Sequence, residues 1–288
     1  MTPTQPTPAA FFGHGNPMNT LAANRYTQAW KDFGAAVAKP RAVLAISAHW
    51  YINGTAVTAM PKPRTIHDFF GFPQELFDFD YPASGAPDVA NEIIETVKPM
   101  YVGLDTETWG LDHGTWSVLA HVFPKADVPV LQLSIHGARD AAYHVELGAR
   151  LAPLRERGVM IVCSGNVVHN LRRIDWQRPD AAFDWAIRFD EEVRGIMTTN
   201  PGRITEVVEH PDYALAVPTA EHFLPVLYLA GLAKACGKPA TIVTHGYDMG
   251  SLSMTSYGLD APAMKAKGGD GSPPFPDPRD IPADDTNT

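Results

Sequence analysis

The sequence has few cysteines and no long apolar segment, and both absences narrow the class of protein. Only two of its 288 residues are cysteines, Cys163 and Cys236, and each stands in an apolar stretch where we expect a free thiol. We therefore expect no disulfide framework, and we expect a reducing compartment. No apolar run approaches the roughly 20 residues that cross a bilayer, and MTPTQPTPAA lacks the features of a signal peptide. We expect a cytoplasmic protein without a membrane partner.

Clustered positive charge is also missing. The chain carries 23 Lys and Arg residues against 32 Asp and Glu residues, which gives a formal net charge of −9. Recognition of phosphate backbones requires basic residues gathered on one surface, and the sequence contains no basic block. We therefore expect no nucleic-acid partner, and a small molecule as the ligand.

Several common catalytic motifs are absent. The sequence has no HExxH or CxxC pair, no GxSxG turn, and no GxGxxG or Walker A loop. These absences argue against a zincin, a thiolate zinc site, an α/β-hydrolase triad and a nucleotide-binding loop. A mononuclear site of imidazole and carboxylate ligands with open positions remains, and such a site suits non-haem Fe(II) and also zinc.

The pattern of apolar residues predicts the fold class. Apolar β-type runs alternate with helical patterns, which favours an α/β domain with a central, mostly parallel or mixed sheet flanked by helices. The expected strands cover residues 9–12, 42–47, 56–60, 128–135, 159–164 and 240–244. The expected helices cover residues 19–38, 88–98, 116–123, 141–157, 181–197 and 221–236.

One catalytic domain over residues 9–261 accounts for this pattern, since no linker or internal repeat divides it. We expect residues 1–8 to form a flexible leader. The segment 262–288 is rich in Pro, Gly and Asp and offers few residues for a core. We expect this tail to be disordered.

Five of the 11 histidines stand at apparent ends of elements, beside Gly, Asn, Asp, Glu or Trp. They are His14 in GHGN, His49 in AHW, His113 in DHGTW, His169 in GNVVHN and His222 in AEHF. One such histidine is usually structural, but five in this context indicate a site. His14 and His49 each close an apolar run, and the ends of strands in an α/β sheet are where ligands bind. This pair predicts half of a metal site.

In their order and spacing, these motifs resemble the LigB superfamily of extradiol ring-cleaving dioxygenases, and within it the 4,5-DOPA dioxygenase extradiol group. The similarity runs over roughly residues 9–258 and leaves out the leader and the tail. It is carried by GHGNPM, SAHW, GLDHGTW, SGNVVHNLR, AVPTAEHFLPVLYLAG and SLSMTSY. Each motif alone is weak evidence for the family, whereas their order and spacing together are specific to it.

The resemblance implies a role for each histidine. His14 and His49 match two metal ligands. The third ligand is a glutamate in the broader superfamily, but the DOPA-type group is histidine-rich, so we favour His222 and keep Glu221 as the alternative. His169 matches the catalytic base, with a role as a fourth ligand as the alternative.

His113 matches the histidine that hydrogen-bonds the substrate hydroxyl or the bound oxygen. The resemblance also implies one divalent metal ion per chain, Fe(II) for turnover or Zn(II) as an ion that the isolated protein carries. About three protein ligands leave room for a catechol and O2, and an imidazole with an ordinary pKa near 6.5 accepts a catechol proton at neutral pH.

The predicted activity is insertion of O2 into a single-ring, DOPA-like catechol to give a muconic semialdehyde. A zinc-dependent hydrolase that uses the same pocket, or a non-catalytic ligand-binding relative, are the alternatives. Asn166 and Asn170 are expected to orient His169 through hydrogen bonds. The sequence leaves open whether the protein is a homo-oligomer.

Overall fold

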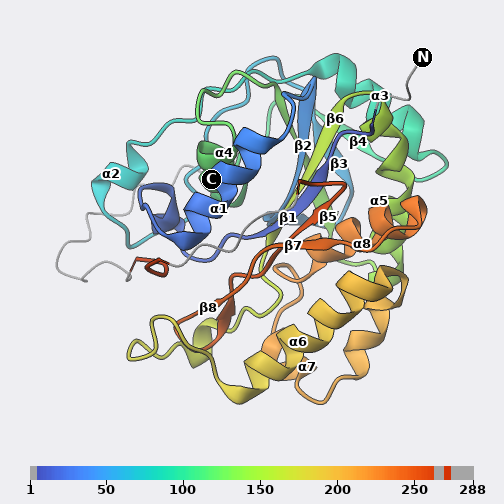
Figure 1. The fold of residues 1–288 in the computed structure, drawn as a ribbon. Helices are drawn as coiled ribbons and strands as arrows, with labels where there is room; N and C mark the ends of the chain where they lie inside the picture. The colour runs from blue at the N-terminus through green and yellow to red at the C-terminus, as the bar shows by residue number, and fades with distance from the viewer. Residues whose placement is uncertain (1–4, 263–268, 274–288) are drawn as a thin grey trace.

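A central sheet between two sets of helices forms the core of the computed structural model, which describes residues 5–262 and 269–273 (Figure 1). The sheet has eight strands in the order β4-β3-β5-β2-β6-β1-β10-β7. They are β1 Ala9–Gly13, β2 Ala42–Ile52, β3 Ala56–Thr58, β4 Gly103–Asp105, β5 Val130–His136, β6 Val159–Gly165, β7 Thr241–Thr244 and β10 Ser256–Leu259. Two short strands, β8 Tyr247–Asp248 and β9 Leu252–Ser253, form a separate antiparallel pair.

The sheet is mixed, as the sequence predicts. Strands β5, β2, β6 and β1 run parallel to one another, and β3 runs parallel to β4. Strand β10 is antiparallel to both β1 and β7, and β3 is antiparallel to β5. The parallel centre carries the long apolar runs, and the antiparallel pairs lie toward its margins.

Helices cover both faces of the sheet. They are α1 Arg25–Ala36, α2 Gln74–Phe77, α3 Pro87–Val97, α4 His113–Val122, α5 Ala141–Glu156, α6 Asp184–Thr199, α7 Tyr213–Ala216 and α8 Leu224–Cys236, with 3-10 turns η1 Pro17–Thr20, η2 Leu171–Arg173 and η3 Pro201–Glu209. Figure 1 shows α1 and α4 on one side of the sheet and α3, α5 and α8 on the other. Helices α6 and α7 lie below the sheet in this view, near β8.

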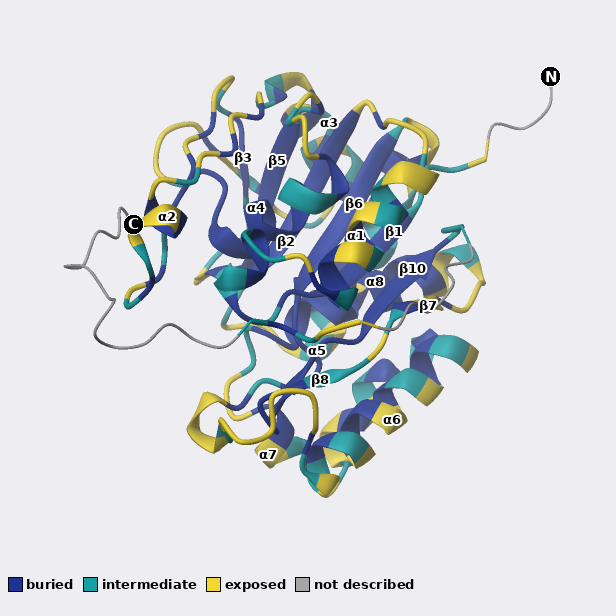
Figure 2. Cartoon of the chain, turned by 60° about the vertical axis from the view of Figure 1, so that its left-hand side comes forward, coloured by how far each residue is buried: buried dark blue, intermediate teal, exposed yellow. Residues whose placement is uncertain are grey.

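Alternate residues of the central strands enter two separate apolar cores. Phe11 of β1 packs in the core on the side of α5 and α8, whereas Phe12 packs in the core on the side of α1 and α4. Both side chains are fully buried. Figure 2 shows the central strands in the colour of buried residues along most of their length. Burial on both faces explains why these strands read as continuous apolar runs rather than as alternating patterns.

Among the expected helices that begin at other residues than predicted, two contribute to the site. Helix α4 begins at His113 because the Asp112 side chain accepts a hydrogen bond from the Thr115 backbone at 3.1 Å. Helix α8 begins at Leu224, so His222 lies in the turn before it. The expected helix over 19–38 is divided into η1 and α1, and Asn24 caps the start of α1.

The ends of the described chain pack against the domain. The Thr7 backbone N–H donates to the Arg155 carbonyl at 3.0 Å, and the Arg25 backbone N–H donates to the Asp270 carbonyl at 2.9 Å. Residues 1–4, 263–268 and 274–288, which hold half of the expected leader and most of the expected tail, lie outside the described residues. Within the described ranges, no helix has the length and apolarity to cross a membrane.

Helices α5 and α8 approach so closely that glycine is required at their crossing. A Cβ atom added to Gly231 of α8 would overlap the Val145 carbonyl oxygen, and one added to Gly148 of α5 would overlap the Tyr228 carbonyl oxygen. This contact fixes α8 against α5, and α8 begins two residues after His222. Close helix packing therefore helps to place a candidate ligand.

We predict that Gly231→Ala destabilises the protein by about 1–3 kcal/mol, because a closely packed backbone cannot accommodate the methyl group. The matched control is Gly195→Ala in α6, where nothing lies within 4 Å of an added Cβ. That change should stabilise the protein by about 0.5–1 kcal/mol through helix propensity. Denaturant unfolding of both variants measures the difference, and equal effects would contradict the packing argument.

A buried histidine joins the same two helices. His144 of α5 is fully buried, and its Nδ1 lies 3.0 Å from the Tyr228 hydroxyl. Burial lowers the pKa of His144 to about 4. The unfolded chain, with an ordinary histidine pKa near 6.5, therefore takes up a proton before the folded protein does.

This difference in pKa predicts acid sensitivity. The stability that neutral His144 contributes is complete above about pH 6.5 and is lost as the pH falls toward 4. Between pH 7 and pH 5 we expect the wild type to lose about 2 kcal/mol more free energy of unfolding than His144→Gln, which does not titrate. Parallel pH dependences in the two proteins would show that the buried imidazole does not cause the sensitivity.

Candidate metal centre

The histidine cluster lies at the carboxyl ends of β1, β2 and β6. Strands β1 and β6 end together, with Gly13 opposite Gly165, and the next residue, His14, donates its backbone N–H to the Gly165 carbonyl at 3.0 Å. His49 lies in β2, two residues beyond Ser47, which pairs with β6. The end of the parallel strands therefore places His14 and His49 side by side, as their positions in the sequence predict.

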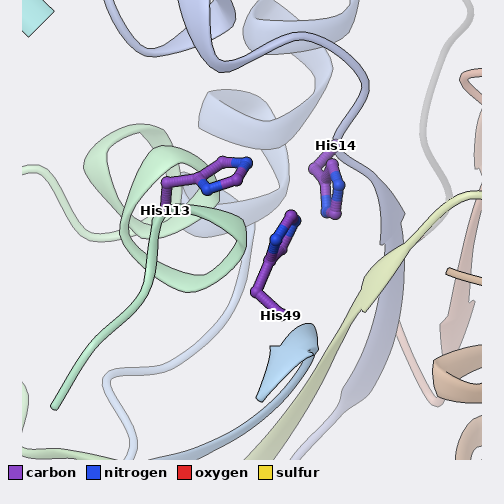
Figure 3. A group of neighbouring side chains, drawn as sticks. All are labelled: His14, His49 and His113. Carbon is purple, nitrogen blue, oxygen red and sulfur yellow. The ribbon is translucent and has the colours of Figure 1, made fainter. Parts of the chain in front are cut away.

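Three imidazoles from separate elements converge at this edge. The ligand atoms of His14, His49 and His113 lie within 4.8 Å of one another, and Figure 3 shows their rings around a common space. The ligand atoms of His169, Glu221 and His222 meet the same criterion as a second group. Together, the two groups contain every candidate ligand and catalytic histidine that the sequence predicts.

The ring of His222 joins the first group to the second. Its centroid lies 5.3 Å from that of His14 and 5.1 Å from that of His49, and the rings of His14 and His49 lie 5.2 Å apart. These three rings form a nearly equilateral triangle. His113 is placed less evenly, since its centroid is 3.9 Å from His49 and 6.0 Å from His14.

The Nδ1 atom of His14 is held by a serine. His14 Nδ1 lies 2.9 Å from Ser164 Oγ, and the Ser164 hydroxyl donates its single proton to the Gly114 carbonyl. Ser164 must therefore accept from His14, which carries its proton on Nδ1 and leaves the lone pair of Nε2 for a ligand.

Carboxylates hold the Nδ1 atoms of three further rings, those of His49, His113 and His222. Asp68 lies 3.1 Å from His49 Nδ1 and 2.9 Å from His113 Nδ1, and Glu221 Oε1 lies 3.3 Å from His222 Nδ1. Carboxylate support of this kind typically fixes the tautomer of a metal-binding histidine. Each ring in the group thus has its Nε2 available.

His49 provides a test of whether a metal ion fits here. Its Nε2 is buried and has no hydrogen-bond partner among the described residues. Leaving such an atom unpaired costs about 1–3 kcal/mol, so a buried orphan nitrogen is a sign of a missing ligand. Imidazole nitrogens with an adjacent carboxylate are donors that divalent transition metals prefer, and the donor set therefore fits a metal ion.

Electrostatics favour the neutral form of most of these rings. Burial lowers the pKa of His14 and His222 well below the ordinary value, and neighbouring imidazoles lower both further. Burial also lowers the pKa of His113. For His49, burial again opposes the charge, but the Asp68 carboxylate outweighs it and raises the pKa. His113 and His49 in turn hold the pKa of Asp68 well below its usual range, despite its burial.

His169 is placed differently from the other histidines. Its ring stacks on that of His222 with centroids 3.5 Å apart and planes 5° apart, and its backbone N–H donates to the Ala216 carbonyl at 2.9 Å. Burial, followed by the charge on His49, lowers its pKa to about 4. Within the described part of the chain, no hydrogen bond holds its ring nitrogens, so the ring can meet a substrate.

The expected support of His169 by two asparagines is wrong. The Asn166 side-chain amide donates to the Ser253 carbonyl at 2.8 Å, and that of Asn170 donates to the Leu215 carbonyl at 2.8 Å. Both amides thus fix the backbone around the site, and they leave the imidazole untouched.

Asp68 and Ser164 are the supporting residues that the sequence does not reveal. Asp68 lies 19 positions after His49 and 45 before His113, and Ser164 lies 150 positions after His14. Such distances along the chain hide these pairs from local patterns, and the position of Asp68 directly after His67 in an aromatic loop is the one local signal for it.

Imidazoles supported by carboxylates, at the carboxyl ends of parallel strands, define the class of a metal-dependent α/β enzyme. The model of the family described as "Catalytic LigB subunit of aromatic ring-opening dioxygenase" matches residues 14–260. The chain belongs to this LigB family, and it is an extradiol aromatic ring-opening dioxygenase. This assignment favours ring cleavage over a zinc hydrolase or a non-catalytic relative.

Proteins that are similar to most of this chain support the family assignment. The 4,5-DOPA dioxygenase extradiol of Escherichia coli (strain K12) is 47% identical over 253 residues, which cover 86% of this chain and 93% of that protein. The 4,5-DOPA dioxygenase extradiol of Beta vulgaris is 34% identical over 259 residues, covering 86% and 94%. A crystal structure of an uncharacterized protein from Escherichia coli K12 matches with a TM-score of 0.77 at 42% identity, covering 88% and 99%.

Proposed function

We propose that the protein cleaves a single-ring, DOPA-like catechol with O2 to a muconic semialdehyde, and that Fe(II) held by His14, His49 and His222 is the working metal. The observation that carries this proposal is the nearly equilateral arrangement of these three rings, each of which has its Nδ1 held by an oxygen atom. The names of the relatives in Escherichia coli and Beta vulgaris, both 4,5-DOPA dioxygenase extradiol, support the substrate class. When bound, Fe(II) would supply the redox chemistry with O2, which Zn(II) lacks.

Glu221 is better suited to support than to direct coordination. Its Oε1 accepts the Thr219 hydroxyl at 2.6 Å and faces His222 Nδ1 at 3.3 Å. A turn of Glu221 toward a metal ion would leave both partners without this acceptor. The arrangement therefore favours His222 as the third ligand, with Glu221 as the carboxylate that orients it.

His169 and His113 act on the substrate in this proposal. His169 is neutral at pH 7, and its untethered ring lies against His222, so it can accept a proton from a catechol hydroxyl. His113 has its Nδ1 occupied by Asp68, and its Nε2 is left to accept a hydrogen bond from a substrate hydroxyl. The even spacing of the other three rings supports this role for His113 over that of a ligand.

One further expectation completes the proposal. The expected location is the cytoplasm, because the free thiols of Cys163 and Cys236 suit a reducing compartment.

Reconstitution tests the activity. The metal-free protein is loaded with Fe(II) under anaerobic conditions, mixed with DOPA, and then exposed to air. We expect oxygen uptake and a yellow semialdehyde, whereas a Zn(II)-loaded sample should bind the catechol without consuming oxygen. The absence of oxygen uptake by the Fe(II)-loaded protein would contradict the proposal.

Replacement of single histidines separates ligands from the base. His14→Ala and His49→Ala should lose stoichiometric metal binding, measured by metal analysis after dialysis. His169→Phe should keep the metal and lose about 10²–10⁴-fold in turnover, because general-base catalysis contributes about that much. His210→Phe, at a histidine outside the cluster, is the control and should keep both properties. Loss of metal from His169→Phe would make His169 a ligand instead.

A further inference from the structure

We propose that Asp68 is a positioning residue that fixes the tautomers of His49 and His113 together, so that one ring presents Nε2 to the metal and the other presents Nε2 to the substrate. The assignment of metal and substrate rests on the proposed function. The tautomers themselves can be measured without either.

The carboxylate of Asp68 divides its two oxygens between the two rings. Oδ2 lies 3.1 Å from His49 Nδ1, and Oδ1 lies 2.9 Å from His113 Nδ1 and 2.9 Å from the His113 backbone nitrogen. The side chain is only 9% exposed, so water competes little for these contacts. An ionised carboxylate can only accept hydrogen bonds, and both rings must therefore donate from Nδ1.

The loop that carries Asp68, between β3 and α2, is held firmly against α4. The Ile66 backbone N–H donates to the Leu111 carbonyl at 2.8 Å, and the Trp116 indole N–H donates to the Ile66 carbonyl at 2.8 Å. On the other side of Asp68, buried Phe69 packs edge-on against His113, with ring centroids 5.5 Å apart. Anchors on both sides leave the carboxylate little freedom to move.

A shared carboxylate links two functions that would otherwise be independent. The ring centroids of His49 and His113 lie 3.9 Å apart, with His49 on strand β2 and His113 at the start of helix α4. Because one group orients both rings, the position of the metal and the position of the substrate hydroxyl are fixed relative to each other. Preorganisation of this kind is what a metal site requires of the residues around its ligands.

Replacement of Asp68 by asparagine should separate the two rings. An amide has one accepting oxygen and one donating nitrogen. The amide oxygen keeps accepting from the two donors of His113, its backbone N–H and its Nδ1–H. The amide nitrogen then faces His49 Nδ1, and its N–H requires a lone pair on that atom. His49 must then carry its proton on Nε2, and a metal ion can bind there only after that proton is displaced.

The experiment is a long-range ¹H–¹⁵N correlation spectrum of the metal-free protein with labelled histidine, recorded at a pH where the rings are neutral. We expect both rings in the Nδ1–H form in the wild type, and His49 alone in the Nε2–H form in Asp68→Asn. The affinity of Asp68→Asn for Zn(II), measured by chelator competition, should fall about 10–100-fold. Asp78→Asn, at an exposed residue whose side chain accepts a hydrogen bond from Gln74, is the matched control and should change neither result.

An Nε2–H form of either His49 or His113 in the wild type would overturn the proposal, and this reading does not depend on the folding of a variant. Unchanged tautomers and unchanged zinc affinity in Asp68→Asn would overturn it as well. Neither measurement involves turnover. A failure of Fe(II)-loaded wild type to consume oxygen would therefore count against the proposed function alone.

Discussion

The tethering of Nδ1 by an oxygen atom is the constraint on which the centre depends. Ser164 holds His14, Asp68 holds His49 and His113, and Glu221 is placed to hold His222. A free imidazole can rotate and can carry its proton on either nitrogen, whereas a tethered one presents a single atom in a single direction. The supporting oxygens therefore determine the direction of each Nε2 atom as much as the positions of the histidines do.

The fold makes these tethers possible by bringing segments unusually close, with backbone against side chains at Gly114 and backbone against backbone at Gly165. A Cβ at Gly114 would lie 2.7 Å from His49 Cδ2, and a Cβ at Gly165 would overlap the His222 carbonyl oxygen. Only glycine permits the start of α4 and the turn before α8 to reach the ends of β2 and β6. Helices α5 and α8 approach each other closely at Gly148 and Gly231 in the same way. Because α8 begins two residues after His222, packing in the hydrophobic core also positions the site.

The sequence predicts the fold and the spatial grouping of the five histidines well, and for physical reasons. Strands such as β2 and β6 are buried on both faces and appear as apolar runs, and His14 and His49 follow from their position at the ends of such runs. The short strands β4, β8 and β9 carry too little pattern to be predicted and form through tertiary pairing. Asp68 and Ser164 escape prediction because their partners are distant in sequence. The choice between Glu221 and His222, adjacent residues, requires side-chain geometry.

The most direct test of this account is a crystal structure of the metal-loaded protein, with the ion identified by anomalous scattering. The account predicts Nε2 atoms of His14, His49 and His222 about 2.0–2.1 Å from a bound zinc ion, with Glu221 on His222 Nδ1. A metal ion held by the Glu221 carboxylate, or by His113 in place of His222, would contradict it.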